Sequence, residues 1–168
     1  MKRVVYLLLA LATFTLAGIG SSYAQEEATA LEQVAVDIWP DFDRPATLVL
    51  LTMTRPANAG EQTLRLPLPP GADVNAVARI SPSGDLVTDQ ITADESTPGV
   101  LAVTTASPQI RVEYYVPYQA DDQQRQIAFE WAADLTVEEL VVSVQQPAAA
   151  ADFELRCIPV AAAMPADS

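Results

Sequence analysis

Apolar and polar side chains alternate with a period of two along most of the chain. Val34, Val36 and Ile38 set the pattern against Ala35 and Asp37. Segments with the same alternation follow at residues 64–68, 101–103, 110–116, 127–131, 140–144 and 153–157. Successive side chains of a strand point to opposite faces of its sheet, so this period predicts strands with one buried face.

Three further segments refine this prediction. Residues 47–53 form a continuous apolar and β-branched run, which is typical of a central strand. Pro67 lacks a backbone donor and predicts an edge strand or a strand end. Ser81–Asp85 contains Pro82 and Gly84, which predicts a hairpin turn between strands at 77–80 and 86–91.

These patterns give a fold class. The chain has 13 prolines and no convincing amphipathic helix. We therefore predict an all-β protein, an antiparallel two-sheet β-sandwich of immunoglobulin-like or related type with eight to ten strands. A closed β-barrel is the alternative.

The N-terminus has the three parts of an export signal. Met1–Arg3 is positively charged, residues 4–20 are apolar, and Ser22 and Ala24 are small residues at positions −3 and −1 before Gln25. We expect cleavage after Ala24 and an extracellular or periplasmic product without stable membrane insertion. An uncleaved N-terminal anchor is the alternative.

The domain organisation follows from the same patterns. The signal peptide occupies residues 1–24, and an acidic, flexible lead is expected at 25–33. A single sandwich domain covers 34–160, and a flexible tail covers 161–168.

The composition excludes several chemistries. The chain has no histidine, its only lysine is Lys2 and its only cysteine is Cys157. Histidine-dependent triads, histidine-ligated metals and, after export, Schiff-base lysines are therefore absent. The net charge of −13 argues against nucleic acid as a partner. Cys157 shares the apolar parity of its segment, so we expect a small, buried and unreactive side chain.

The segment Trp39–Pro45, WPDFDRP, is the densest candidate site. Asp41 and Asp43 could supply oxygen ligands to Ca²⁺, with Trp39 beside them as a ligand platform. Calcium needs roughly 6–8 oxygens, so the motif favours a strand-to-strand corner instead. In that corner Asp43 caps backbone amides and Arg44 pairs with a carboxylate. No cofactor is expected, with Ca²⁺ an unsupported possibility.

The segment Tyr114–Tyr118, YYVPY, is the second candidate. Tyr114 and Tyr118 share one face of a strand and Tyr115 lies on the other. Exposed aromatics could stack on sugar rings or hold a partner protein. Alternatively, two of the three rings belong to the core and their hydroxyls reach its rim. We assign Trp39, Tyr115 and Tyr118 as the candidate ligand-binding residues.

Adjacent acids occur at 94–95, 121–122 and 138–139. Neighbouring strand residues point to opposite faces, whereas two glycosidase carboxylates must converge across roughly 5–9.5 Å. The doublets are therefore expected to be solvent-exposed charges, and no catalytic residue is assigned.

The two aromatic segments, with Trp131, Gln145–Pro147, Phe153 and Pro159, resemble a group of short exported bacterial β-rich proteins of unassigned function. The resemblance covers most of the chain beyond the signal. It implies export and a single β-rich domain, and it supplies no catalytic residues.

We therefore predict a non-catalytic module outside the cytoplasm, acting in binding or cell-surface assembly. Its partner would be another envelope protein or a neutral glycan. The alternatives are a carboxylate-dependent glycan hydrolase and a calcium-stabilised adhesion module.

Cleavage of the signal can be tested directly. The intact mass of the exported protein should correspond to a chain that begins at Gln25. A membrane-bound species that retains Met1 would instead identify an anchor.

Overall fold

The computed structural model describes residues 30–121, 124–133, 135–147, 150–152, 154 and 156. The regular secondary structure of these described residues consists of eleven β-strands. They are β1 (Ala30–Pro40), β2 (Thr47–Thr54), β3 (Gln62–Pro67), β4 (Asp73–Ile80), β5 (Leu86–Val87), β6 (Ile91–Asp94), β7 (Val100–Thr105), β8 (Gln109–Val116), β9 (Gln119–Ala120), β10 (Arg125–Gln126) and β11 (Thr136–Val144).

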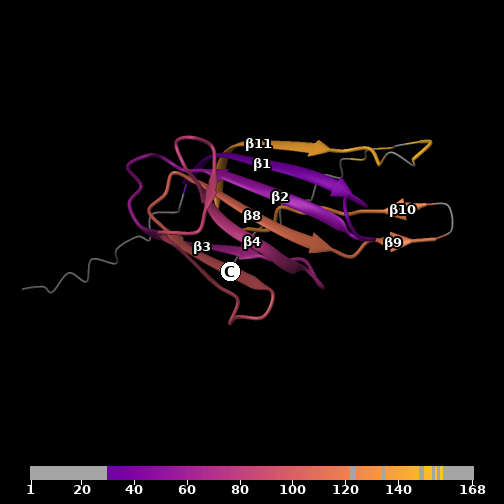
Figure 1. Ribbon diagram of the computed structural model, residues 1–168, viewed down its shortest axis with the longest axis horizontal. Coiled ribbons are helices and arrows are strands. Elements are labelled where there is room, and N and C mark those ends of the chain that lie inside the picture. Colours follow the sequence, from indigo (N-terminus) through magenta and orange to yellow (C-terminus); the bar gives the residue numbers. More distant parts are fainter. Residues whose placement is uncertain are drawn as a thin grey trace, which may run out of the picture.

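The strands form two facing sheets and one short hairpin (Figure 1). The large sheet has the order β11-β1-β2-β8-β4-β5, and the small sheet has the order β3-β7-β6. The predicted β-sandwich is confirmed, and its sheets do not close into a barrel. The described residues form eleven strands where eight to ten were predicted, because short pairs such as β9 and β10 add to the count. One pair departs from the antiparallel prediction, because β1 and β11 run parallel.

The core lies between the two sheets. Strand β2 is buried without interruption from Thr47 to Leu51, as a central strand should be. The small sheet contributes Leu64, Leu101 and Val103 to the core, each with no exposed surface. Strand β3 is an edge strand and ends at Pro67, as the missing backbone donor of proline predicts.

The Ser81–Asp85 turn joins β4 to β5 as predicted. Gly84 has φ = 90°, and its N–H donates to the Ser81 carbonyl at 2.8 Å. The expected strand at 86–91 is divided, because β5 pairs with β4 in the large sheet and β6 pairs with β7 in the small one. Gln90 lies between them with φ = 58°, a left-handed conformation that redirects the chain.

The alternating segment at 127–131 is not a strand. Ile127, Phe129 and Trp131 are partly buried against the core, whereas Ala128 and Glu130 are exposed. The alternation thus reports the directions of side chains along an extended backbone, and it does not require a neighbouring strand. This segment leads from the β9–β10 hairpin towards β11.

The boundary of the domain also differs from the prediction. Strand β1 begins at Ala30 and not at Val34, because Leu31 is fully buried in the core and Ala30, Leu31 and Gln33 pair with β11. The predicted signal peptide, Cys157 and the C-terminal tail lie outside the described residues, as does most of the predicted strand at 153–157.

Arg55, directly after β2, is 1% exposed. Its Nη1 donates to the carbonyls of Thr105 at 2.9 Å and Ser107 at 3.2 Å. Its Nη2 donates to the Gly60 carbonyl at 2.9 Å and to Gln62 Oε1 at 3.0 Å. One guanidinium therefore links the end of a large-sheet strand to the ends of β3 and β7, and burial lowers its pKa.

Replacing Arg55 with Met should lower the free energy of unfolding by about 3 kcal/mol, because four acceptors lose a charged donor. Arg55→Lys should recover only part of the loss, since an ammonium cannot reproduce the planar fork. Denaturant titration measures both variants. Arg65→Met, at an exposed arginine on β3, is the matched control; an equal loss there would contradict this role for Arg55.

Candidate functional site

Four loops meet at one end of the sandwich, which we call the loop end: residues 41–46, 68–72, 95–99 and 117–118. Strands β1 and β8 end there, and β2 begins there, because Thr47 pairs with both Pro40 and Val116. The loop at 68–72 crosses between the sheets, from β3 to β4. The β9–β10 hairpin extends beyond the sandwich from this end, at the right of Figure 1.

The turn at 41–46 has a defined backbone conformation. Asp41 has φ = 53°, a left-handed geometry that aspartate adopts more readily than most residues. Its N–H donates to the Ala46 carbonyl at 3.0 Å, and the Ala46 N–H donates to the Arg44 carbonyl at 2.7 Å. These bonds close the connection between β1 and β2.

Tyr115 fixes one side of this turn. Its hydroxyl donates to Asp43, 2.9 Å from each carboxylate oxygen. The Arg44 guanidinium lies over the Tyr115 ring, 3.3 Å from the ring centroid, and reaches Asp73 Oδ2 at 3.0 Å. Burial and the bond to Asp43 raise the pKa of Tyr115.

Tyr115 differs from the exposed aromatic that the sequence suggested, because only 7% of its surface is accessible. The ring packs with Leu48 and Leu50 on the outer face of the large sheet, and Arg44 covers it. The Tyr115 ring therefore supports the turn at 41–46 from below Arg44. Any contact with a ligand would have to be made through the residues around it.

Tyr118 and Arg125 fix the other side of the turn. The Tyr118 hydroxyl donates to Asp41. Arg125 Nε lies 2.8 Å from Asp41 Oδ2 and 3.3 Å from the Tyr118 hydroxyl oxygen. The bond to Tyr118 and the charge of Asp41 raise the pKa of Arg125. This contact ties the β9–β10 hairpin to the turn.

The two aspartates already have donors from the chain itself. Asp43 accepts from Tyr115, and Asp41 accepts from Tyr118 and Arg125. A calcium ion would have to displace these donors, and no group of three potential metal ligands occurs among the described residues. Arg44 does pair with a carboxylate, as the corner interpretation predicted, whereas Asp43 accepts from Tyr115 where backbone amides were expected.

The accessible aromatic side chains at the turn are Phe42 and the neighbouring Trp39 of β1. Trp39 is half-buried and packs on the same outer cluster as Tyr115. Phe42 is 55% exposed, and its ring centroid lies 5.0 Å from that of Trp39 with the planes tilted by 48°. Sequence reasoning passed over Phe42, although an aromatic residue between two aspartates in a turn was a signal of exposure.

Asp73 and Arg125 were also missed by sequence reasoning. They come from β4 and β10, and each meets the turn only through the strand topology. The distance in sequence between either residue and the turn gives no indication that they are in contact. The register that sets Asp73 opposite Tyr115 is the feature that positions it beside Arg44.

The loop end also has a groove of about 330 Å³, lined by residues 68–72 and by Glu95, Thr97, Gly99 and Val100. Gly71 has φ = 77°, and a Cβ there would lie 3.1 Å from Pro117 Cγ, so glycine is required in its wall. The wall continues into β4 at Asp73, which binds Arg44. The groove and the turn are therefore linked.

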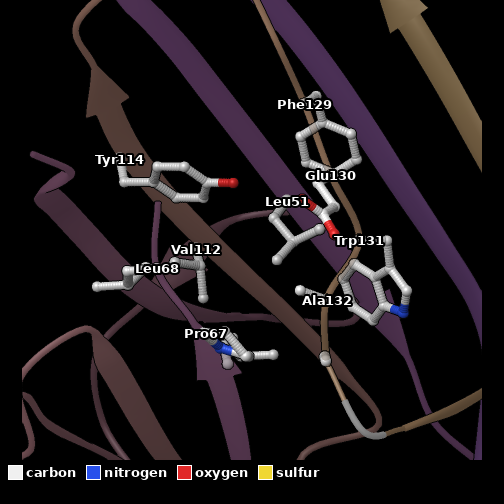
Figure 2. A pocket seen from close by; sticks show the side chains of 11 residues that line it. Leu51, Pro67, Leu68, Val112, Tyr114, Phe129, Glu130, Trp131 and Ala132 are labelled. Carbon is white, nitrogen blue, oxygen red and sulfur yellow. The ribbon is translucent and has the colours of Figure 1, made fainter. Parts of the chain in front are cut away.

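A second hollow lies between the sheets and has a volume of about 20 Å³, room for about one water molecule. Figure 2 shows the Tyr114 hydroxyl directed into it, with Phe129, Glu130 and Trp131 on the opposite side. Burial raises the pKa of Tyr114 to about 12. Tyr114 is thus a core residue, whereas Tyr118 is only partly buried and lies at the rim.

In two of the acidic doublets, one carboxylate accepts hydrogen bonds from another residue of the chain. Asp94 accepts from the Ser96 N–H at 2.8 Å and from the Ser96 hydroxyl at 3.0 Å, and these bonds lower its pKa. Glu139 accepts from Gln33 Nε2 at 2.5 Å. Both carboxylates are exposed, as predicted for surface charges.

The two buried tyrosines should respond differently to replacement by phenylalanine. At pH 7, Tyr115→Phe should lower the free energy of unfolding by about 1 kcal/mol, because the Asp43 carboxylate loses the hydrogen bond from the Tyr115 hydroxyl. Tyr114→Phe should change it little, since no hydrogen bond of its hydroxyl occurs among the described residues.

Above pH 10, Tyr114→Phe should become more stable than the wild type. A raised tyrosine pKa stabilises the fold below the unfolded pKa, and this stability is lost as the pH rises through the folded pKa. The wild type should therefore lose stability between pH 10 and about 12, and Tyr114→Phe should reduce that loss. Denaturant titrations across this range measure it; an unchanged alkaline slope in Tyr114→Phe would contradict the assignment.

Comparison with known proteins gives little similarity. No family model matches the chain, and no curated protein matches it. Among solved structures, the chain is similar to the seventh ScaB type I cohesin from Pseudobacteroides cellulosolvens, with a TM-score of 0.37 and 8% sequence identity over 74% of this chain and 99% of the cohesin chain. In the described residues, no helix is long and apolar enough to span a membrane.

Proposed function

We propose that this protein is a non-catalytic module that binds another protein outside the cytoplasm, and that the loop end is its binding surface. The observation that carries the proposal is the exposed Phe42 ring beside Trp39, on a turn held from both sides. Aromatic residues of this kind supply much of the binding energy at protein interfaces.

The turn is already ordered in the absence of a partner. Tyr115 and Arg44 hold it on one side, and Tyr118 and Arg125 hold it on the other. A surface that is already ordered loses less conformational entropy when a partner binds. The contacts that fix Asp41 and Asp43 therefore favour recognition by Phe42.

The shape of the aromatic pair favours a protein over a glycan. A sugar ring stacks on one flat aromatic face, whereas the Trp39 and Phe42 planes are tilted by 48° and do not share one flat face. We call this tilted pair the aromatic ridge. A ridge fits into an apolar pocket of a partner. The adjoining groove, which includes Pro69 and Pro70, could receive a side chain in return.

Charge restricts the chemistry of the partner. The chain has a net charge of −13, so a partner surface should be neutral or basic around its apolar pocket. The acids of the turn each bind a tyrosine hydroxyl, an arrangement that supports a structural role. A glycan hydrolase would instead need two carboxylates that converge on a sugar.

The test is capture of partners from the envelope of the producing cell, followed by binding of each captured protein in purified form. Phe42→Ala and Trp39→Ala should each weaken that binding by at least about tenfold. Leu86→Ala, which removes an exposed apolar side chain from β5, is the matched control and should bind as the wild type does.

Three outcomes would contradict the proposal. Binding that is equal in the wild type, Phe42→Ala and Trp39→Ala would exclude the aromatic ridge as the binding surface. Binding to a glycan array that depends on Trp39 would identify a glycan in place of a protein. Hydrolysis of a glycan would overturn the non-catalytic assignment.

A further inference from the structure

Strand β11 is an edge strand with exposed apolar side chains. It has nine residues, and β1 is its only partner among the described strands. Leu140, Val141 and Val142 are 47%, 40% and 43% exposed. Three consecutive apolar residues are thus accessible on a strand whose second side has no partner among the described strands.

The register places these residues on both faces of the large sheet. Leu140 and Val142 pair with Val34 and Val36, whose side chains lie in the core. Val141 pairs with Ala35 and so lies on the outer face. Leu140 and Val142 therefore continue the inner face of the sheet past the region that the small sheet covers.

The free side of β11 carries backbone groups. In a parallel pair, alternate residues direct both backbone groups towards the neighbouring strand. The Gln145 N–H donates to the Ile38 carbonyl at 2.9 Å, so odd-numbered residues face β1. By the same parity, the backbone groups of Leu140 and Val142 face away from it.

Apart from Glu138 and Glu139, this edge lacks the features that usually prevent strand pairing. The sequence TVEELVVSV contains no lysine, proline or glycine, and its pairing with β1 shows no bulge. At the other edge of the large sheet, β5 has only two residues. Strand β11 is therefore the edge that can accept a long partner strand.

We propose that β11 pairs with β11 of a second copy of this chain, antiparallel and centred on Val141. The two large sheets then become one continuous sheet. Leu140 of each copy lies opposite Val142 of the other on the inner face. Val141 lies opposite its own equivalent on the outer face.

Self-complementarity and charge argue for a second copy as the occupant. In this register Glu138 faces Val144 and Glu139 faces Ser143, so no carboxylate faces another. A partner strand must also be apolar on both faces at its centre, and β11 itself has that property. A register centred on Glu139 would oppose like charges and is disfavoured.

Ionic strength should control the association. Each copy has a net charge of −13, which opposes dimerisation at low salt. Salt screens this repulsion, because the Debye length shortens to about 3 Å at 1 M. The dimer should therefore strengthen as the salt concentration rises, opposite to the usual behaviour of an interface between opposite charges.

Disulfide trapping tests the register. Val141→Cys in a Cys157→Ser background puts two thiols at a directly opposed pair with Cβ atoms roughly 4.5–5.5 Å apart. Mild oxidation should then give a covalent dimer. Ser143→Cys in the same background is the matched control, since its two copies lie roughly 13 Å apart. Cross-linking at least tenfold faster in Val141→Cys supports the register; equal rates, or none in either variant, overturn it.

Sedimentation velocity tests the association itself. The wild-type chain should form a dimer that increases with protein and NaCl concentration. Val141→Lys should abolish the dimer, because it sets two cations opposite each other, and should retain the wild-type denaturation profile because the site is exposed. A monomer at every concentration in high salt would overturn the proposal, as would a dimer that is unaffected by Val141→Lys.

Discussion

A single buried cation fixes how the two sheets meet. Arg55 lies at the end of β2 and is 1% exposed, and its guanidinium reaches acceptors from the chain around β3 and beyond β7. Removing a charge from water costs several kcal/mol unless its donors are satisfied. Carbonyl and amide oxygens, not a carboxylate, accept from both terminal nitrogens of Arg55, whereas its Nε has no partner among the described residues. The loops that supply these oxygens must therefore follow one path around the guanidinium. The end of β2 is thereby held to the ends of β3 and β7.

The loop end is organised by a different kind of interaction. Its ion pairs, Arg44 with Asp73 and Arg125 with Asp41, are partly exposed, and such pairs contribute little stability individually. Their effect is geometric, because each one shares an aspartate or an arginine with a tyrosine contact. The result is a turn whose orientation is fixed while Phe42 stays accessible. One end of the molecule thus secures the fold and the other presents a surface.

Local sequence patterns predicted the strands better than their partners. The central position of β2, the edge position of β3 and the turn at Ser81–Asp85 follow from burial, proline and glycine, which act within a few residues. The parallel pairing of β11 and the contact of Arg125 with Asp41 depend on how distant segments are arranged in space. The alternation at 127–131 shows the limit most clearly, since side-chain direction is local and strand pairing is not. The candidate site was found by its aromatic and acidic residues, but the supporting role of Tyr115 depends on the topology, which brings Asp43 and Arg44 against its ring.

The parallel pair of β1 and β11 has a consequence for how the molecule is assembled. Gln33 and Glu139, in contact across this pair, are 106 residues apart in the chain. Loop-closure entropy must be overcome before such contacts form, and long-range pairing slows folding. During synthesis from the N-terminus, β1 emerges before the other described strands, and one of its sides stays unpaired until β11 has followed. The side of β1 that faces β11 is therefore open to non-native strand pairing until β11 has been synthesised.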